Sequence, residues 1–400
     1  MDIPKPTVIK VLGLGGGGSN AVNRMIELGL EGVGFIAANT DAQALNLSLA
    51  PTRIQLGPRL TRGLGAGGNP EIGEAAADEN RAELKAALAG ADLVFLTAGM
   101  GGGTGTGAIP VAAEAARAVA ALTIAIVTTP FTFEATRRRR NAEAGLAKLR
   151  PKADTLITVP NDKLLNLVGR NIAFDVSLRV ADEVLRQGVQ GLAELIGKPG
   201  LINVDFAHVR ELLARNTTGR AMLAIGHGRG ERKADEAVQQ ALKMPLLESG
   251  SVESARGLLV HFTGGDDLSL VEASQAVADI TRAAPQAEVI FGATVDPLMT
   301  GRAQVILAAT GLPEPPPHEA VIRPTPASIA ETHRRPTPHA ASDEQASPLA
   351  EALFNQAFTN PDPLEQPWVV ADTPAPNANS LDVPAFLRKR RSLRDLEKGK

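Results

Sequence analysis

The sequence predicts an α/β fold in which a doubly wound parallel sheet is followed by a smaller mixed α+β domain. Short β-branched runs alternate with helical runs through the first part of the chain, a pattern typical of a parallel sheet covered by helices. Several of these runs end in glycine-rich turns, where parallel sheets bind ligands. After Gly311 the composition changes, because residues 313–376 contain 14 of the 28 prolines, and a disordered linker is expected there.

Composition and charge exclude several classes of protein. With 400 residues and 44% hydrophobic content, the chain is long enough for two cores. A net charge of −3 argues against a general nucleic-acid binder, and the lack of cysteine excludes disulfides and thiolate metal sites. The six histidines lack metal-ligand spacing, so no protein-ligated metal is expected. Because no segment resembles a signal peptide or an apolar span of about 20 residues, we expect a cytoplasmic protein.

The expected elements follow from local periodicity and breaker residues. In the first domain we expect strands at 7–12, 33–38, 53–56, 93–98, 122–129 and 155–159, and helices at 21–28, 71–89 and 109–121. A longer helical pattern over 172–196 stops at a Gly-Lys-Pro-Gly sequence, and its length of about 37 Å suits a strut between two domains. In the second domain we expect strands at 257–263, 287–294 and 303–310, and helices at 235–243 and 268–284.

The glycine-rich stretch 99–107 is the strongest local signal of a binding site. It holds six glycines, each of which costs roughly 0.5–1 kcal/mol inside a regular element. The stretch follows an apolar strand and precedes a helix, so backbone N–H groups and a positive helix end point at one place, and Thr104 and Thr106 add hydroxyl donors. This pattern predicts a phosphate site without the lysine of a Walker loop. The alternative is a flexible hinge or a packed glycine turn.

Two further glycine turns occur after the first and third strands. Residues 13–20 contain Gly-x-Gly-x-x-Gly, which formally matches a dinucleotide fingerprint, and Asp41 stands where such sites place an acid. A nicotinamide oxidoreductase is therefore an alternative at this point. The turn at 63–70 adds a third glycine loop to the same expected sheet edge, more than one pyrophosphate requires.

Taken together, the motifs resemble those of the FtsZ family, the bacterial tubulin-like GTPases that polymerise at the division site. The resemblance covers about residues 7–312 and a short C-terminal stretch. Its motifs occur in family order at Asn39-Thr40-Asp41, 65–70, 101–107, 130–134, Pro160-Asn161-Asp162 and 203–206. The implied tubulin/FtsZ-like fold divides into a GTP-binding domain (1–170), a central helix (171–200), a catalytic loop with its helix (201–216), an α+β domain (217–312), a disordered linker (313–380) and a partner-binding basic tail (381–400).

The resemblance also implies the residues that bind GTP. Asp182 matches the carboxylate that accepts hydrogen bonds from guanine; the alternative is an ordinary exposed helix acid. Four residues earlier, Leu178 stands where many members have a phenylalanine, which removes base stacking of about 1 kcal/mol. The implied nucleotide-binding residues are Gly16, Gly17, Gly18, Ser19, Asn20, Gly103, Thr104, Gly105, Glu134, Arg138, Asn161 and Asp182.

In this family, the loop after the central helix of the next subunit completes the active site. Here Asn203 and Asp205 are in place, but His208 replaces the second acid. Neutral imidazole can accept a hydrogen bond from water, whereas protonated imidazole cannot, and Glu211 lies on the same helical face as a partial substitute. We therefore predict slow or pH-dependent hydrolysis. The alternative is that His208 is tolerated and hydrolysis is normal.

The chain ends in a stretch that looks like the FtsZ tail peptide. An apolar set stands beside a basic cluster with a net charge of +5 over residues 388–400, as in short peptides that order in a partner's groove. The implied partners are membrane tethers and division regulators; the alternative is a tail that only contacts anionic lipid. The implied partner-binding residues are Asp382, Val383, Pro384, Phe386, Leu387 and Arg388.

The prediction is thus a cytoplasmic, self-assembling GTPase at the division site, which hydrolyses GTP to GDP and phosphate across a head-to-tail contact. A head-to-tail contact that does not close generates a filament. Mg²⁺ is expected through the nucleotide phosphates, with no protein ligand assigned. The alternative is a hydrolysis-deficient family member that acts as a structural filament scaffold.

Overall fold

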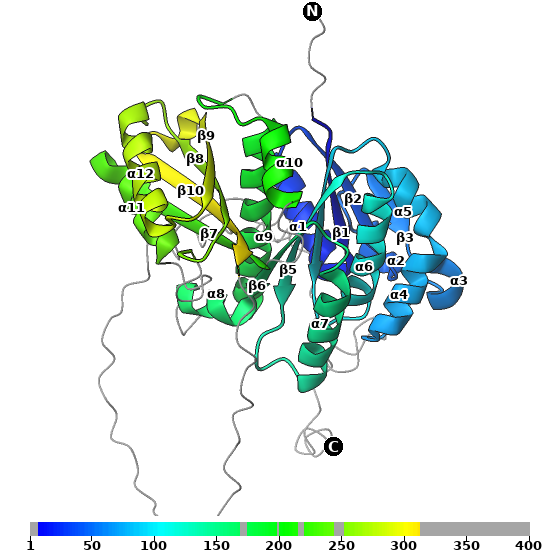
Figure 1. Cartoon of the computed structure of the whole chain (residues 1–400). Helices are drawn as coiled ribbons and strands as arrows, with labels where there is room; N and C mark the ends of the chain where they lie inside the picture. The colour runs from blue at the N-terminus through cyan, green and yellow to red at the C-terminus, as the bar shows by residue number, and fades with distance from the viewer. Residues whose placement is uncertain (1–6, 169–173, 198–199, 215–219, 244–251, 313–400) are drawn as a thin grey trace, which may run out of the picture. The chain divides into compact units, whose positions relative to one another are not determined.

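A computed structural model describes residues 7–168, 174–197, 200–214, 220–243 and 252–312 (Figure 1). These residues form a ten-stranded sheet with the order β3-β2-β1-β4-β5-β6-β7-β10-β8-β9. The strands are β1 (Ile9–Leu14), β2 (Val33–Asn39), β3 (Thr52–Gln55), β4 (Leu93–Gly99), β5 (Leu122–Thr129), β6 (Thr155–Pro160), β7 (Arg220–Arg229), β8 (Gly257–Gly264), β9 (Glu288–Val295) and β10 (Arg302–Leu312).

The first six strands are parallel and are covered by helices on both faces. Alternate residues of β1 point to opposite faces, so Val11 packs in one core with α1 and α9, while Leu12 packs in the other with α4, α5, α6 and α7. The predicted doubly wound sheet is confirmed. The helices are α1 (Gly15–Glu27), α2 (Ala42–Asn46), α3 (Pro58–Thr61), α4 (Pro70–Glu79), α5 (Arg81–Leu88), α6 (Thr104–Arg117), α7 (Thr136–Leu149), α8 (Asn161–Val168), α9 (Phe174–Gly197), α10 (Phe206–Ala214), α11 (Lys233–Leu242) and α12 (Leu270–Ala283), with short 3₁₀ turns η1 (Gly230–Arg232) and η2 (Pro297–Met299).

The mixed strands after α10 continue the sheet of the first domain, a continuity that the sequence did not show. β7 pairs in parallel with β6 through Leu156↔Arg220 and Ile157↔Ala221, so the sheet continues from one part to the other. β7 itself was not predicted, because its glycines weaken a strand pattern. A Cβ atom at Gly226 would lie 1.9 Å from Ala237 O, so the glycine is needed where α11 packs directly on the strand.

Three helix boundaries also differ from prediction. α1 begins at Gly15 and α6 at Thr104, so the glycine-rich runs form the first turns of these helices. The expected helix 71–89 is two helices that meet at Asn80, whose Oδ1 accepts a hydrogen bond from Gly57 N at 2.8 Å. The long helix is confirmed as α9, which runs from Phe174 to Gly197.

Ala120, in the turn between α6 and β5, adopts a left-handed backbone conformation with φ of 60°. A Cβ atom is unfavourable there, whereas glycine adopts this conformation without a penalty. We expect Ala120→Gly to raise the free energy of unfolding by about 1 kcal/mol in a denaturant titration. Ala118→Gly is the matched control, because Ala118 has a helical φ of −67° and its replacement should lower stability by about 0.5–1 kcal/mol. Destabilisation by both variants would contradict the prediction.

Candidate functional site

The three glycine-rich loops pack against one another at the carboxyl ends of β1 and β4. A Cβ atom at Gly15 would lie 2.8 Å from Gly105 N, and one at Gly17 would lie 3.3 Å from Gly99 N. A Cβ atom at Gly103 would lie 2.8 Å from Ala66 Cβ, which brings in the third loop. The structure therefore places the predicted loops in one cluster at the ligand-binding edge of the parallel sheet.

Most glycines in this cluster serve close packing, so the alternative of a packed glycine turn holds for them. A Cβ atom at Gly107 would lie 2.0 Å from Pro70 O on α4, and one at Gly18 would lie 2.3 Å from Thr97 O. Gly16 and Gly102 are different, because a Cβ atom at either position would meet nothing within 4 Å. These two glycines mark the side of the cluster that has room for a ligand.

Side chains hold the loop after β4 in place. Thr106, for which the sequence predicted a hydroxyl donor, is buried, and its Oγ1 accepts a hydrogen bond from Gly101 N at 2.8 Å, so it supports the loop. Thr104 Oγ1 lies 2.6 Å from Thr40 Oγ1. Asn141, which the sequence did not single out, donates from Nδ2 to Gly101 O at 3.2 Å. No sequence motif marks Asn141, since its role depends on where α7 packs.

Two expected nucleotide-binding residues carry buried polar atoms that lack a hydrogen-bond partner in the described structure. They are Oγ of Ser19, in the first turns of α1, and Oδ1 of Asn161, at the start of α8. Both residues are less than 7% exposed. Asn20, by contrast, is exposed. An unpaired buried polar atom costs about 1–3 kcal/mol, a cost that a ligand donor or acceptor removes.

Glu134 and Arg138 bind each other. Arg138 Nη1 donates to Glu134 Oε2 at 2.5 Å, and Glu134 Oε1 accepts from Phe131 N at 3.0 Å. The same loop is fastened to α8, because Thr132 donates to Asp162 from its backbone N at 2.8 Å and from Oγ1 at 2.5 Å. Phe131 stacks on Phe133, with ring centroids 4.9 Å apart. The predicted pair therefore joins this loop to α7, and the loop itself is bonded to Asp162, the residue after Asn161.

Asp182 lies half-buried on α9, next to Glu183. Burial raises the pKa of the Asp182 carboxyl to about 7; the nearby negative charge of Glu183 adds to this shift, and Arg24 on α1 opposes it. An ordinary exposed helix acid would not show this perturbation. The side chain of Leu178 lies outside the described residues.

The expected catalytic loop lies apart from the glycine loops within one chain. Ile202 forms a bridge with Ala293 of β9, the edge strand at the far end of the sheet order from β3. Asn203 Oδ1 accepts from Gly200 N at 2.6 Å, and Asp205 Oδ1 accepts from Ala207 N at 2.9 Å, which caps α10. Asn203, Asp205, His208 and Glu211 are all exposed. These groups can therefore meet a second molecule.

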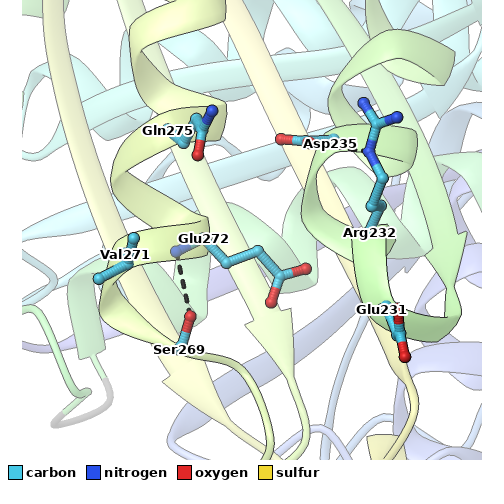
Figure 2. Close-up of a pocket in the computed structure, with 7 residues that line it drawn as sticks. All are labelled: Glu231, Arg232, Asp235, Ser269, Val271, Glu272 and Gln275. Atoms are coloured by element: carbon cyan, nitrogen blue, oxygen red, sulfur yellow. Dashed lines mark hydrogen bonds and ion pairs between the residues drawn. The ribbon is translucent and has the colours of Figure 1, made fainter.

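An open hollow lies elsewhere, between η1 and α11 on one side and α12 on the other (Figure 2). It contains none of the predicted site residues. Its polar groups partly satisfy one another: Arg232 Nε lies 3.4 Å from Asp235 Oδ2, and Ser269 Oγ accepts from Glu272 N at 3.1 Å as the cap of α12. The lining residues are Glu231, Arg232, Asp235, Ser269, Val271, Glu272 and Gln275.

The described residues lack two features, a metal-binding cluster and a membrane-spanning helix. They contain no cluster of three or more histidine, aspartate or glutamate side chains arranged to hold a metal ion. None of their helices has the length and apolarity that crossing a bilayer requires. The predicted tail residues from Asp382 to Arg388 lie outside the part of the chain that the structure describes.

Comparison with known proteins agrees with this architecture. Residues 8–169 match the GTPase domain of the Tubulin/FtsZ family, and residues 219–313 match the C-terminal domain of the FtsZ family. An empty FtsZ dimer from M. jannaschii is 46% identical over 77% of this chain and 89% of that chain, with a TM-score of 0.74. CetZ2 from Haloferax volcanii, in a GTPγS-bound protofilament, is 21% identical over 77% of this chain and 94% of that chain, with a TM-score of 0.64, and shares the fold.

Proposed function

This chain belongs to the FtsZ family and carries its GTPase domain, and from this premise we propose that it is a GTP-dependent, self-assembling filament protein. The observation that carries the proposal is the cluster of three glycine loops, with open space beside Gly16 and Gly102 and unsatisfied buried atoms on Ser19 and Asn161. Such a cluster suits the phosphates of a nucleotide, which accept hydrogen bonds from backbone N–H groups at helix N-termini.

In the proposed complex, the phosphates lie on the first turns of α1 and α6, and guanine lies against Asp182. The dinucleotide alternative loses its support, because Asp41 caps α2 by accepting from Gln43 N at 2.9 Å and Ala44 N at 3.0 Å. Mg²⁺ would be bound through phosphate oxygens and water, since the described residues offer no ligand cluster for it. Its chemistry there would be to neutralise phosphate charge.

Hydrolysis requires a second molecule in this proposal. The loop that carries Asn203, Asp205 and His208 borders β9, whereas the glycine loops follow β1 and β4, near the middle of the sheet. A head-to-tail contact between two copies would place the loop with Asn203, Asp205 and His208 of one copy over the nucleotide of the other. Repetition of this contact would build a filament. The M. jannaschii relative is described as a dimer, which supports self-association.

The proposal is tested by GTP hydrolysis per subunit over a series of protein concentrations, with filaments pelleted from the same tubes. We expect turnover and polymer to appear together above one threshold concentration, and ATP to support neither. Hydrolysis that does not depend on concentration would contradict the shared active site. Polymer without turnover would favour the second candidate, a scaffold that binds GTP but does not hydrolyse it, for which the specific observation is His208 in the catalytic loop.

His208 gives a separate prediction about rate. We expect His208→Asp to raise turnover per polymerised subunit several-fold. An ionised carboxylate accepts a hydrogen bond from the attacking water, whereas imidazole does so only when it is neutral. The measurement is phosphate release at saturating GTP, from pH 6 to pH 8. His208→Asn is the matched control, since it is polar but carries no acid. Equal rates for His208→Asp and the unmodified chain would show that His208 does not limit hydrolysis.

The cellular role is the remaining part of the proposal. We propose that the filaments act at the division site in the cytoplasm and that the tail around Asp382–Arg388 binds a tether or regulator. The support is family membership together with the basic, apolar sequence of residues 381–400. Deletion of residues 381–400 should leave GTP turnover unchanged and remove the protein from the division site in cells.

A further inference from the structure

Asp182 stands beside two charged residues to which the proposed nucleotide site gives no role. We propose that a guanine nucleotide displaces a proton from Asp182 when it binds, and that Arg24 and Glu183 are positioning residues that determine how much of a proton leaves. This inference rests on the proposed function, since it concerns the same base-binding carboxylate. It adds a regulatory consequence: nucleotide affinity depends on pH near neutrality.

Glu183 is a buried negative charge that has its own donors. It is 0% exposed, and its carboxylate accepts from Arg186 Nε at 2.8 Å, from Arg186 Nη2 at 2.6 Å and from Gln187 Nε2 at 2.9 Å. Arg24 Nε lies 4.0 Å from Glu183 Oε2. These partners hold the Glu183 carboxylate in place, and its negative charge acts on the neighbouring carboxyl of Asp182.

Asp182 differs from Glu183 because no group in the described structure donates a hydrogen bond to its carboxylate. Partial burial, the lack of protein donors and the nearby negative charge of Glu183 all favour the protonated form of Asp182. The pKa of about 7 agrees with this geometry. Besides Asp182, the charged groups with described side chains on these packed helices are Arg24 and Glu27 on α1, Arg179, Glu183, Arg186 and Glu194 on α9, and Asp162 and Lys163 on α8.

Guanine supplies the missing donors. Its N1–H and N2–H₂ groups lie on one edge, and a carboxylate accepts both hydrogen bonds only when it is ionised. Binding therefore lowers the pKa of Asp182, and the proton passes to solvent. With a starting pKa of about 7, about 0.5 proton leaves per nucleotide at pH 7. Apparent affinity should fall about tenfold from pH 8 to pH 6, because protonated protein must first lose its proton.

Calorimetric titration of the nucleotide-free full chain with GDP tests this inference. Binding enthalpy is measured at pH 7 in buffers of different ionisation enthalpy, and the slope gives the protons released. The GDP phosphates also titrate in this range, so the decisive quantity is the difference between variants. Arg24→Gln should move the release from Asp182 toward one proton, because it removes the opposing cation. Glu183→Gln should move it toward zero. Glu27→Gln is the matched control. It removes the charge that pairs with Arg24 at 3.6 Å but leaves Arg24 and Glu183 in place, so proton release should change little.

Three outcomes are distinguishable. Opposite shifts for Arg24→Gln and Glu183→Gln would support the inference. Equal proton release by the unmodified chain and both variants would overturn it while leaving GTP binding intact. Absence of any GDP binding heat, with no protection against thermal unfolding by GDP, would instead overturn the proposed function. If Glu183→Gln fails to fold, Arg24→Gln still gives a test in the opposite direction, since Arg24 lies nearer the surface of α1.

Discussion

Asp205→Asn is expected to reduce GTP turnover per polymerised subunit by about 100-fold while filaments still form. A carboxylate that positions or deprotonates water contributes roughly 10²–10⁴ to rate, and an amide cannot accept the proton. Asp205 also caps α10, since it accepts a hydrogen bond from Ala207 N, and asparagine is an equally good cap. The substitution should therefore reduce the rate of hydrolysis without reducing stability. The measurement is phosphate release and pelleting from the same samples.

Two controls separate chemistry from folding. Asp205→Ala removes the cap as well as the charge, so it should lower the free energy of unfolding by about 1 kcal/mol in addition to its effect on rate. Asp154→Asn tests a carboxylate elsewhere. Asp154 stands just before β6 and accepts a hydrogen bond from Thr123 N of β5, and its replacement should leave turnover unchanged. If Asp205→Asn polymers hydrolyse GTP at the wild-type rate, Asp205 has no catalytic role.

Gly107→Ala is expected to destabilise the protein by about 3 kcal/mol or more, at the upper end of overpacking substitutions. A Cβ atom at this position would lie 2.0 Å from Pro70 O and 2.5 Å from Glu74 N, both of them backbone atoms of α4. The helices α4 and α6 must therefore separate to admit one methyl group. The measurement is the midpoint of urea unfolding, and the slope of the transition reports whether the native state has expanded.

Gly102→Ala is the matched control in the same glycine run. Its Cβ atom would meet nothing within 4 Å, and Gly102 does not have a positive φ, so stability should change by no more than about 0.5 kcal/mol. If Gly102 borders the phosphates, this variant should instead weaken GTP binding. Equal destabilisation by both variants would contradict the claim that Gly107 is tightly packed whereas Gly102 has free space around it.

The positions of the parallel strands along the chain and the long helix could be predicted, because both depend on local sequence patterns. The runs around Val11, Phe95 and Ile126 are apolar and β-branched, and each becomes a buried central strand. α9 has apolar residues at helical spacing and helix-breaking residues at its end, so both of its ends were predicted within a few residues. The GTP-binding and catalytic roles of the named residues stay predictions.

Other features could not be read from local pattern. β7 was missed because Gly226 and Gly228 look like breakers until α11 is seen packed on them. Thr106 looked like a phosphate donor, yet it is buried and holds Gly101. The continuation of the sheet from β6 into β7 was not predicted, because this pairing joins residues far apart in sequence, such as Leu156 and Arg220.

The sequence by itself determined the secondary-structure order of the parallel sheet, the clustering of three glycine loops at one edge, and the family. These depend on periodicity, turn residues and motif spacing, which act over a few neighbouring positions. Only the tertiary structure decided which glycines pack and which leave room, and which of two adjacent acids on α9 lacks hydrogen-bond donors. Gly107 and Gly102 are equivalent in sequence, but only Gly107 faces the backbone of another helix. Asp182 and Glu183 are adjacent acids, but Arg186 and Gln187 donate to Glu183 and not to Asp182, because hydrogen-bond geometry and burial are set by packing and not by composition.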